Sequence, residues 1–258
     1  MKLNYKILLL CLLTCASACF PAFAQEQEKE KETFAQPIQE FPFAEPVYLQ
    51  DQHEIQSTLN YYHDYNSEYI GNNLSFEVEY GIMDWWQVSA EYGHHYQHRP
   101  VQKSYNINDL ELGTMFSVFN TARQAASFAM SVEIPVKKPA LAGEEVDGVN
   151  TSFSPMLIYA RQLGSKAQLH LNGGTEIEQQ EYEWFYNAAA VYGSGHWHPL
   201  LELNGTYQDK EAEWYLAPGF VLNGNSNWEL VAGARRSLRH NDWGGSVKLL
   251  FEFTAGRH

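Results

Sequence analysis

Residues 73–93 constrain the fold more than any other stretch, because their pattern predicts a single β-hairpin. Apolar and polar residues alternate along both arms, and this period of two places successive side chains on opposite faces of a strand. The apolar set is Leu74, Phe76, Val78 and Tyr80 in the first arm and Trp86, Val88, Ala90 and Tyr92 in the second. A short turn, residues 81–85, joins the arms. Similar segments recur along the chain, so the sequence predicts an all-β protein.

Twelve such segments follow from residue 54 onward, each about as long as a tilted strand that crosses a bilayer. We expect strands at residues 54–62, 73–81, 86–94, 107–118, 126–135, 151–162, 167–176, 183–192, 199–207, 213–222, 227–235 and 244–253. Connections after the even-numbered strands are short, whereas most of those after the odd-numbered strands are longer and more polar. Short turns on one rim and long loops on the other are typical of membrane barrels. The sequence therefore predicts one antiparallel transmembrane β-barrel of about 12 strands, with both ends at the short-turn rim.

The N-terminal residues have the layout of an export signal. Residues 1–24 combine two lysines, an apolar stretch and Ala22-Phe23-Ala24, which is typical of a cleaved signal peptide. All three cysteines lie in it, and modification of Cys19 as a lipoprotein is the alternative reading. We then expect a flexible acidic periplasmic leader at residues 25–52, the outer-membrane barrel at 53–254 and a C-terminal tail at 255–258.

The polar faces of the expected strands carry mostly carboxylates. A twelve-stranded barrel is wider than the eight-stranded kind that side chains can fill, so these residues are expected to line a wet lumen. The lumen-lining candidates are Glu77, Glu79, Glu91, Asp109, Glu111, Glu133, Glu202, Glu229, Lys248 and Glu252. Aromatic residues gather at strand ends, which predicts two girdles at the membrane surfaces. A secreted soluble all-β protein remains an alternative, because soluble sandwiches alternate too.

Two strands depart from the simple pattern. In residues 151–162 both faces are apolar, with Leu157 and Tyr159 on one side and Ile158 and Ala160 on the other. This predicts either a bulge that resets the register or a misplaced boundary. Pro218 has no backbone N–H for the ladder, so a bulge or strand end is expected there.

Several histidines are candidate metal ligands, and a few polar residues are candidates for a catalytic group. His94, His95 and His98 near one loop are weak metal candidates, because no carboxylate partner has recognisable ligand spacing. Ser104, His95 and Asp109 are individually suited to catalysis, but no strand motif collects them. We therefore expect no enzyme activity, no cofactor and no bound metal. The formal net charge of −14 makes nucleic acid an unsuitable partner.

Several short motifs resemble one known family. They are Glu79-Tyr80-Gly81-Ile82-Met83-Asp84-Trp85, Asn108-Asp109-Leu110-Glu111-Leu112-Gly113, Val132-Glu133-Ile134-Pro135, Leu201-Glu202-Leu203-Asn204-Gly205 and Ala217-Pro218-Gly219-Phe220. With them the chain resembles the bacterial outer-membrane β-barrels of the MetA-pathway-of-phenol-degradation family of transporters, over most of residues 54–253. Val136 stands where the family usually has Gly, and a short tail follows the last strand.

The resemblance implies an outer-membrane channel for passive uptake of small molecules, aromatic or hydrophobic ones among them. The expected partners are outer-membrane lipid and an unidentified solute, and the expected state is a monomer. The alternative is a non-conducting barrel with a structural or partner-binding role, its lumen blocked by the leader or by residues 136–150. The acidic lumen face further predicts that an open pore prefers cations.

Overall fold

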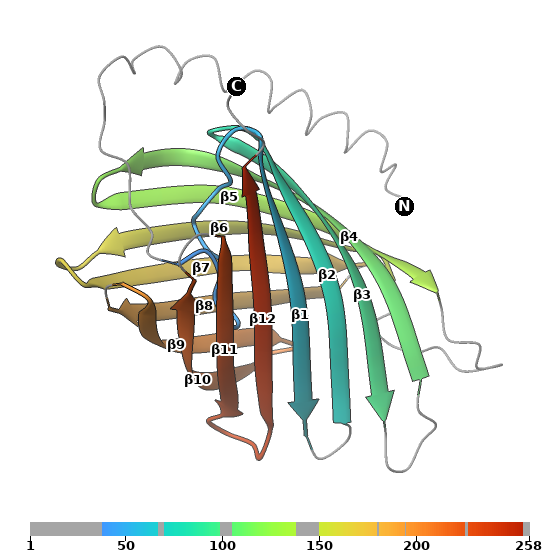
Figure 1. Ribbon diagram of the computed structural model, residues 1–258. Helices are drawn as coiled ribbons and strands as arrows, with labels where there is room; N and C mark the ends of the chain where they lie inside the picture. Colours follow the sequence, from blue (N-terminus) through green and yellow to red (C-terminus); the bar gives the residue numbers. More distant parts are fainter. Residues whose placement is uncertain are drawn as a thin grey trace. The chain divides into compact units, whose positions relative to one another are not determined.

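The structure is a computed structural model that describes residues 38–66, 70–98, 105–137, 150–179, 181–193, 195–224 and 227–254. These residues form twelve antiparallel strands, and β12 pairs with β1, so that the sheet closes into a barrel (Figure 1). The strands are β1 (Glu54–Tyr65), β2 (Ile70–Met83), β3 (Trp86–His98), β4 (Tyr105–Thr121), β5 (Gln124–Lys137), β6 (Ser152–Gln162), β7 (Ala167–Glu178), β8 (Glu181–Tyr192), β9 (Trp197–Gln208), β10 (Glu211–Asn223), β11 (Trp228–Ser237) and β12 (Trp243–Thr254). The predicted fold class is confirmed.

Alternation along the strands separates an apolar outer face from a polar inner face. On β2, Phe76 is 51% exposed on the outer side, whereas its neighbour Ser75 is 1% exposed on the inner side. Leu157 on β6 is 63% exposed in the same outward sense. Apolar side chains displayed outward around a closed barrel are suited to lipid rather than to water. Tyrosine and tryptophan side chains such as Tyr65 and Trp228 are exposed at strand ends, where girdles were expected.

The predicted irregularity of residues 151–162 is wrong. β6 pairs with β5 without a register shift, and it keeps Ile158 and Ala160 inside while Leu157 faces out. Both of its faces are apolar because the inner face packs against another part of the chain instead of water. Pro218 also lies within a strand, opposite Leu201 on β9, and no register shift accompanies it. It coincides with a gap in the pairing of β10 with β11.

The expected contrast between short turns and long loops holds only in part. Glu54 pairs with Thr254, so both ends of the barrel lie at the rim of the turns between β2 and β3 and between β4 and β5. On the opposite rim, however, β9 and β10 are joined by Asp209 and Lys210, whose φ angles of 51° and 71° form a tight hairpin turn. The strands are longer than predicted and absorb residues assigned to loops. The β5–β6 connection remains long, and residues 138–149 of it lie outside the described residues.

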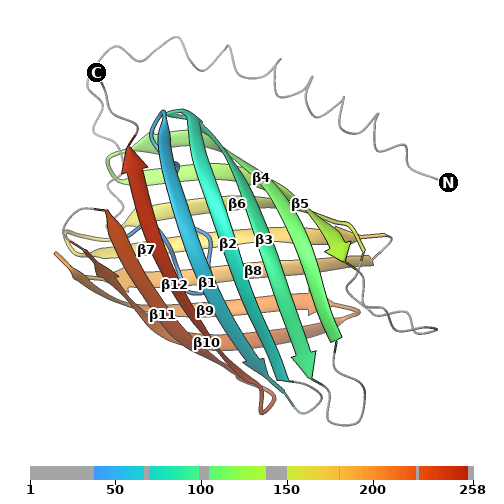
Figure 2. The same ribbon diagram turned by 45° about the vertical axis from the view of Figure 1, so that its right-hand side comes forward.

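Residues 38–50, called the inner segment below, run inside the barrel (Figures 1 and 2). Ile38, Phe41 and Gln50 are 1%, 0% and 2% exposed. The chain then turns at the rim, where the backbone N–H of His53 donates to the Gly81 carbonyl at 2.8 Å. The expectation of a flexible leader over residues 25–52 is therefore wrong for residues 38–52, and residues 25–37 lie outside the described part. The short-turn half of the lumen contains packed chain.

Two apolar clusters hold the inner segment against the wall. Ile38, Phe41 and Ala44 pack with inward side chains of β8 to β12, and Val47 packs with inward side chains of β4 to β6. The wall residues are Ala189, Val191, Leu200, Val221, Val231 and Leu250 in the first cluster and Met115, Ala125, Ile158 and Ala160 in the second. Burial of each large apolar side chain contributes about 1.5–3 kcal/mol to the free energy that holds the segment in place.

No helix among the described residues is long and apolar enough to cross a membrane.

Candidate functional site

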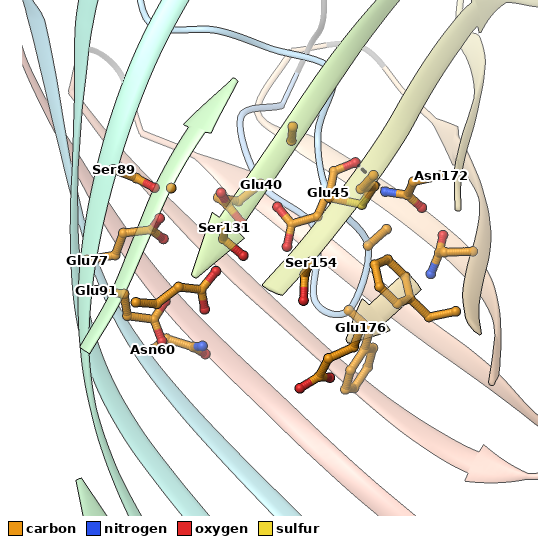
Figure 3. A pocket seen from close by; sticks show the side chains of 18 of the residues that line it. Glu40, Glu45, Asn60, Glu77, Ser89, Glu91, Ser131, Ser154, Asn172 and Glu176 are labelled. Carbon is orange, nitrogen blue, oxygen red and sulfur yellow. Dashed lines mark hydrogen bonds between the residues drawn. The ribbon is translucent and has the colours of Figure 1, made fainter. Parts of the chain in front are cut away.

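Alongside the inner segment the lumen contains a cavity of about 560 Å³. Its lining combines side chains of the barrel wall with side chains of the inner segment (Figure 3). Carboxylates outnumber basic groups among the residues that line it. The lining glutamates are Glu40, Glu45, Glu77, Glu79, Glu91, Glu111, Glu133 and Glu176, and the lining basic residues are Arg235 and Lys248. The cavity is therefore a strongly acidic chamber inside a closed wall.

Four of the predicted lumen residues form a row across the wall, which we call the glutamate ladder. Glu77 of β2 pairs with Glu91 of β3, Glu91 with Glu111 of β4, and Glu111 with Glu133 of β5. Each occupies an inward position of its strand, because the alternation places it on the face opposite the lipid-facing residues. Figure 3 shows Glu77 and Glu91 next to each other on the cavity wall. The ladder brings four carboxylates from separate strands to one side of the chamber.

Two further predicted lumen residues bind the inner segment. Glu229 accepts hydrogen bonds from the backbone N–H groups of Gln39 and Glu40, both at 3.1 Å. Glu202 accepts one from the backbone N–H of Phe43 at 3.3 Å. Both carboxylates are buried, at 0% exposed for Glu202 and 4% for Glu229. The inner segment is not paired with a neighbouring strand, so the two glutamates supply the acceptors for these N–H groups instead.

Glu79 lies at the centre of a buried amide network. Its carboxylate accepts hydrogen bonds from the side-chain amides of Gln50 at 3.2 Å, Gln56 at 2.9 Å and Gln87 at 2.5 Å. Gln50 belongs to the inner segment, and its backbone N–H donates to Gln87 at 2.9 Å. Glu79 therefore stabilises the last residue of the inner segment. Of the remaining candidates, Glu252 lies opposite Gln56 near the short-turn rim.

Both basic residues of the chamber already have partners. The Lys248 Nζ lies 2.6 Å from the Glu40 carboxylate, and the two side chains are 14% and 6% exposed. Arg235 pairs with Asp64 at 2.9 Å. The Arg235 guanidinium also lies 4.9 Å from the centre of the Tyr62 ring, within cation–π range. The close ion-pair partners of both basic residues of the chamber therefore lie outside the ladder.

The histidine and catalytic candidates are only partly brought together. His95 lies 2.6 Å from Asp109, and His94 contacts the Asn108 side chain at 2.6 Å. His98 is exposed at the end of β3. Ser104 lies outside the described residues. Among the described residues no group of three or more histidine, aspartate or glutamate side chains is arranged to hold a metal ion.

Four charged residues in or beside the chamber were not predicted from the sequence. Glu40 and Glu45 fell within the expected flexible leader, although both line the chamber. Arg235 and Asp64 were not assigned to the lumen face, because Arg235 lay at the last residue of an expected strand and Asp64 beyond the end of another. One signal was present in the sequence: the inner face of β6 is apolar at Ile158 and its neighbours. An apolar patch on a lumen face requires something to cover it.

The fold and the site define a closed twelve-stranded antiparallel barrel with an apolar outer face and an acidic lumen that the inner segment partly fills. No protein-family model and no curated protein matches the chain. Its resemblance to the MetA-pathway family therefore remains a prediction.

Solved structures share the fold. The COG4313 outer membrane channel from Pseudomonas putida F1 superposes with a TM-score of 0.64 at 12% identity, covering 81% of this chain and all of that chain (100%). The KdgM porin superposes with a TM-score of 0.55 at 11% identity, covering 76% of this chain and 99% of its own. KdgM in complex with disordered oligogalacturonate gives 0.56 at 12% identity, with 76% and 99% covered. At such identities the likeness establishes a common barrel architecture.

Proposed function

We propose that the protein is an outer-membrane β-barrel channel for the passive uptake of small molecules. The observation that carries this proposal is the acidic cavity of about 560 Å³ inside a closed barrel whose outer face is apolar. The shared architecture with solved porins and channels supports it. The proposal includes export by residues 1–24, residence in the outer membrane, and transport without catalysis. Small aromatic or hydrophobic solutes are the class that the family resemblance implies.

A second candidate, a non-conducting barrel with a structural or partner-binding role, is favoured by the inner segment. The segment occupies the short-turn half of the lumen and is anchored through Glu40, Phe43 and Gln50. In the channel proposal this segment limits the flow of solute, and its release widens the path. In the second candidate it closes the barrel permanently. The two functions therefore differ in what removal of the inner segment does.

The charge of the lumen bears on the solute. Oligogalacturonate, named with one of the KdgM structures, is a chain of anionic sugars. The chamber here has an excess of glutamates over Arg235 and Lys248, and a low-dielectric wall focuses their field. Such a lumen repels anions and attracts cations. We therefore propose a preference for cations or neutral solutes over anionic saccharides.

Single-channel recording in planar bilayers tests the proposal. The mature protein is compared with a variant that lacks residues 38–50, in symmetric salt and then in a KCl gradient. We expect small currents from the full chain, larger currents from the deletion variant, and a reversal potential of cation-selective sign in both. The selectivity should shrink at high salt, because the Debye length falls to about 3 Å at 1 M.

Two results would contradict the proposal. Absence of current above background in both proteins, with the barrel shown to be folded by its resistance to protease, would favour the non-conducting barrel. An anion-selective reversal potential would instead contradict the acidic lumen as the path of the solute. Recovery of the protein in outer-membrane fractions of the producing cell tests the location separately.

A further inference from the structure

Three basic residues are exposed on one side of the short-turn rim. Arg123 lies in the turn between β4 and β5, Arg161 is the next-to-last residue of β6, and Lys166 lies in the turn between β6 and β7. The backbone N–H of Gln162 donates to the carbonyl of Arg123 at 2.9 Å. Arg161 itself pairs with Gln124 of β5. Neighbouring strands therefore bring these three residues, called the basic rim below, to one sector of the barrel.

The basic rim has no acidic residue close to it in the sequence. The chain has 31 aspartates and glutamates against 17 lysines and arginines, yet residues 112–132 and 153–175 contain no acidic residue at all. Among the described residues none of the three basic side chains forms an ion pair. In the neighbouring β2–β3 turn, Asp84 accepts a hydrogen bond from the backbone N–H of Gln52 at 3.2 Å. No described carboxylate is therefore paired with the positive charges of this sector.

On the opposite rim, basic and acidic residues are mixed. Lys210 stands between Asp209 and Glu211 in the sequence. His240 lies 3.8 Å from the carboxylate of Glu213. Interspersed charges of both signs suit a surface that faces water, whereas a sector of one sign attracts a partner of the opposite sign. The basic rim therefore indicates an anionic partner.

Exposed apolar side chains next to the basic rim favour a lipid surface over an acidic protein as that partner. Arg161 shares the outward face of β6 with Leu157, which is 63% exposed. On β4 the register shifts between Ser117 and Phe119, and the consecutive residues Val118 and Phe119 are 55% and 43% exposed. In a bilayer the charged headgroups lie directly beside the acyl chains. A basic sector that borders an apolar one matches this arrangement.

Two tyrosines place the basic rim at the level of the headgroups. Tyr159 lies two residues before Arg161 on the same face of β6, and its hydroxyl donates to the Gln124 side chain at 2.9 Å. Tyr192, the last residue of β8, is 59% exposed. Tyrosines gather where acyl chains meet headgroups, and arginine and lysine side chains there extend toward the phosphates. The basic rim therefore has the surroundings of a phosphate-binding interface.

We propose that the basic rim binds anionic glycerophospholipids, such as phosphatidylglycerol, through Arg123, Arg161 and Lys166. A guanidinium can hold a phosphate by two parallel hydrogen bonds, and a lysine adds a point charge. Short turns place this rim on the periplasmic side, where the leaflet consists of glycerophospholipids. The inference goes beyond the proposed channel and rests only on the proposed location in the outer membrane.

Native mass spectrometry of the purified protein in neutral detergent tests the inference. The protein is titrated with an equimolar mixture of phosphatidylglycerol and phosphatidylcholine, and the bound lipids are counted. We expect the anionic lipid to be retained at least about tenfold more than the zwitterionic one, because each basic residue near a lipid surface adds to the attraction. The triple variant Arg123→Gln with Arg161→Gln and Lys166→Gln should lower this preference to less than about threefold.

Two further variants serve as controls. Lys210→Gln with Arg236→Gln and Arg239→Gln removes the same formal charge from exposed positions of the opposite rim, and it should retain the preference. Arg123→Lys with Arg161→Lys keeps the positive charge of the basic rim, and it should retain most of the preference. Resistance of each barrel to protease shows that the variants are folded.

Several outcomes would overturn the inference. They are equal retention of the two lipids, an unchanged preference in the folded triple variant of the basic rim, and an equal loss in the opposite-rim variant, which would indicate non-specific attraction. Displacement of the lipid by soluble polyglutamate would instead indicate an acidic protein as the partner. Lipid binding in detergent does not require conduction. A conducting protein without the preference would therefore contradict this inference alone, and a non-conducting protein with it would contradict the channel alone.

Discussion

At Lys248 a single cation joins the barrel wall to the inner segment. Its Nζ lies 2.6 Å from Glu40, and both side chains are largely buried. In Lys248→Met the Glu40 carboxylate remains buried without its partner, which costs about 3–5 kcal/mol for a buried pair. We expect residues 38–50 to be cleaved faster by added protease and the bilayer current to rise. Lys248→Met combined with Glu40→Gln should restore much of the resistance. Unchanged cleavage in the single variant would show that the pair does not hold the segment.

Glu45 should make the position of the inner segment depend on pH. Enclosure by the barrel raises the pKa of the Glu45 carboxyl from 4.5 to about 8; Lys248 opposes the rise, whereas Glu40, Glu111 and Glu79 add to it. The pKa of Glu45 is therefore higher when the segment lies in the barrel than when it is released. Protonation of Glu45 stabilises the bound segment fully below pH 4.5, and this stabilisation is lost as the pH rises through about 8.

Bilayer currents at about pH 5 and about pH 9 test this expectation. The current should rise at the higher pH by a few-fold only, because the Glu45 side chain is exposed to the cavity. Glu45→Gln should remove this part of the pH dependence, and Glu181→Gln at the rim should retain it. A current that falls with rising pH in the unmodified protein, and rises in Glu45→Gln, would reverse the assigned sign.

Two glycines on β10 and β11 leave room for the inner segment. Gly219 and Gly233 pair across the two strands, and a Cβ on Gly233 would lie 2.7 Å from Pro42. Gly233→Val should therefore displace the segment at a cost of about 1–3 kcal/mol. We expect faster proteolysis of residues 38–50 with the barrel still folded. In Gly173→Ala, where nothing lies closer than 3.6 Å, the proteolysis rate should stay unchanged. Equal rates in both variants would contradict this role of the glycine pair.

The strands themselves could be predicted, because apolar and polar residues alternate along each one according to whether they face outward or inward. Leu74 to Tyr80 on β2 alternates with polar residues, and the structure places that stretch in a strand with the predicted faces. The inner segment shows no such alternation. It contains Pro42 and Pro46 and no regular period, so its composition matched that of a mobile leader. Its order comes from contacts with the wall, which local sequence does not encode.

For the whole molecule, closure and strand number followed from the sequence, whereas the content of the lumen did not. Strand count, alternation and the lengths of the connections favoured a barrel, in which each strand has a partner on both edges. The bond between Glu40 and Lys248, however, joins residues 208 positions apart. The sites that depend on such contacts include the pairing of Arg235 with Asp64, across 171 positions. The acidic face could be predicted as a set of residues, but its position relative to the inner segment required the structure.

The anchoring of the inner segment also fixes an order of assembly. The acceptors for the N–H groups of Gln39, Glu40 and Phe43, and the ion-pair partner of Glu40, come from β9, β11 and β12, which are made near the end of synthesis. Ile38 and Phe41 have no apolar surface to cover until those strands have paired. Residues 38–44 precede every strand in the chain, yet we expect them to take their place only after β8 to β12 have paired.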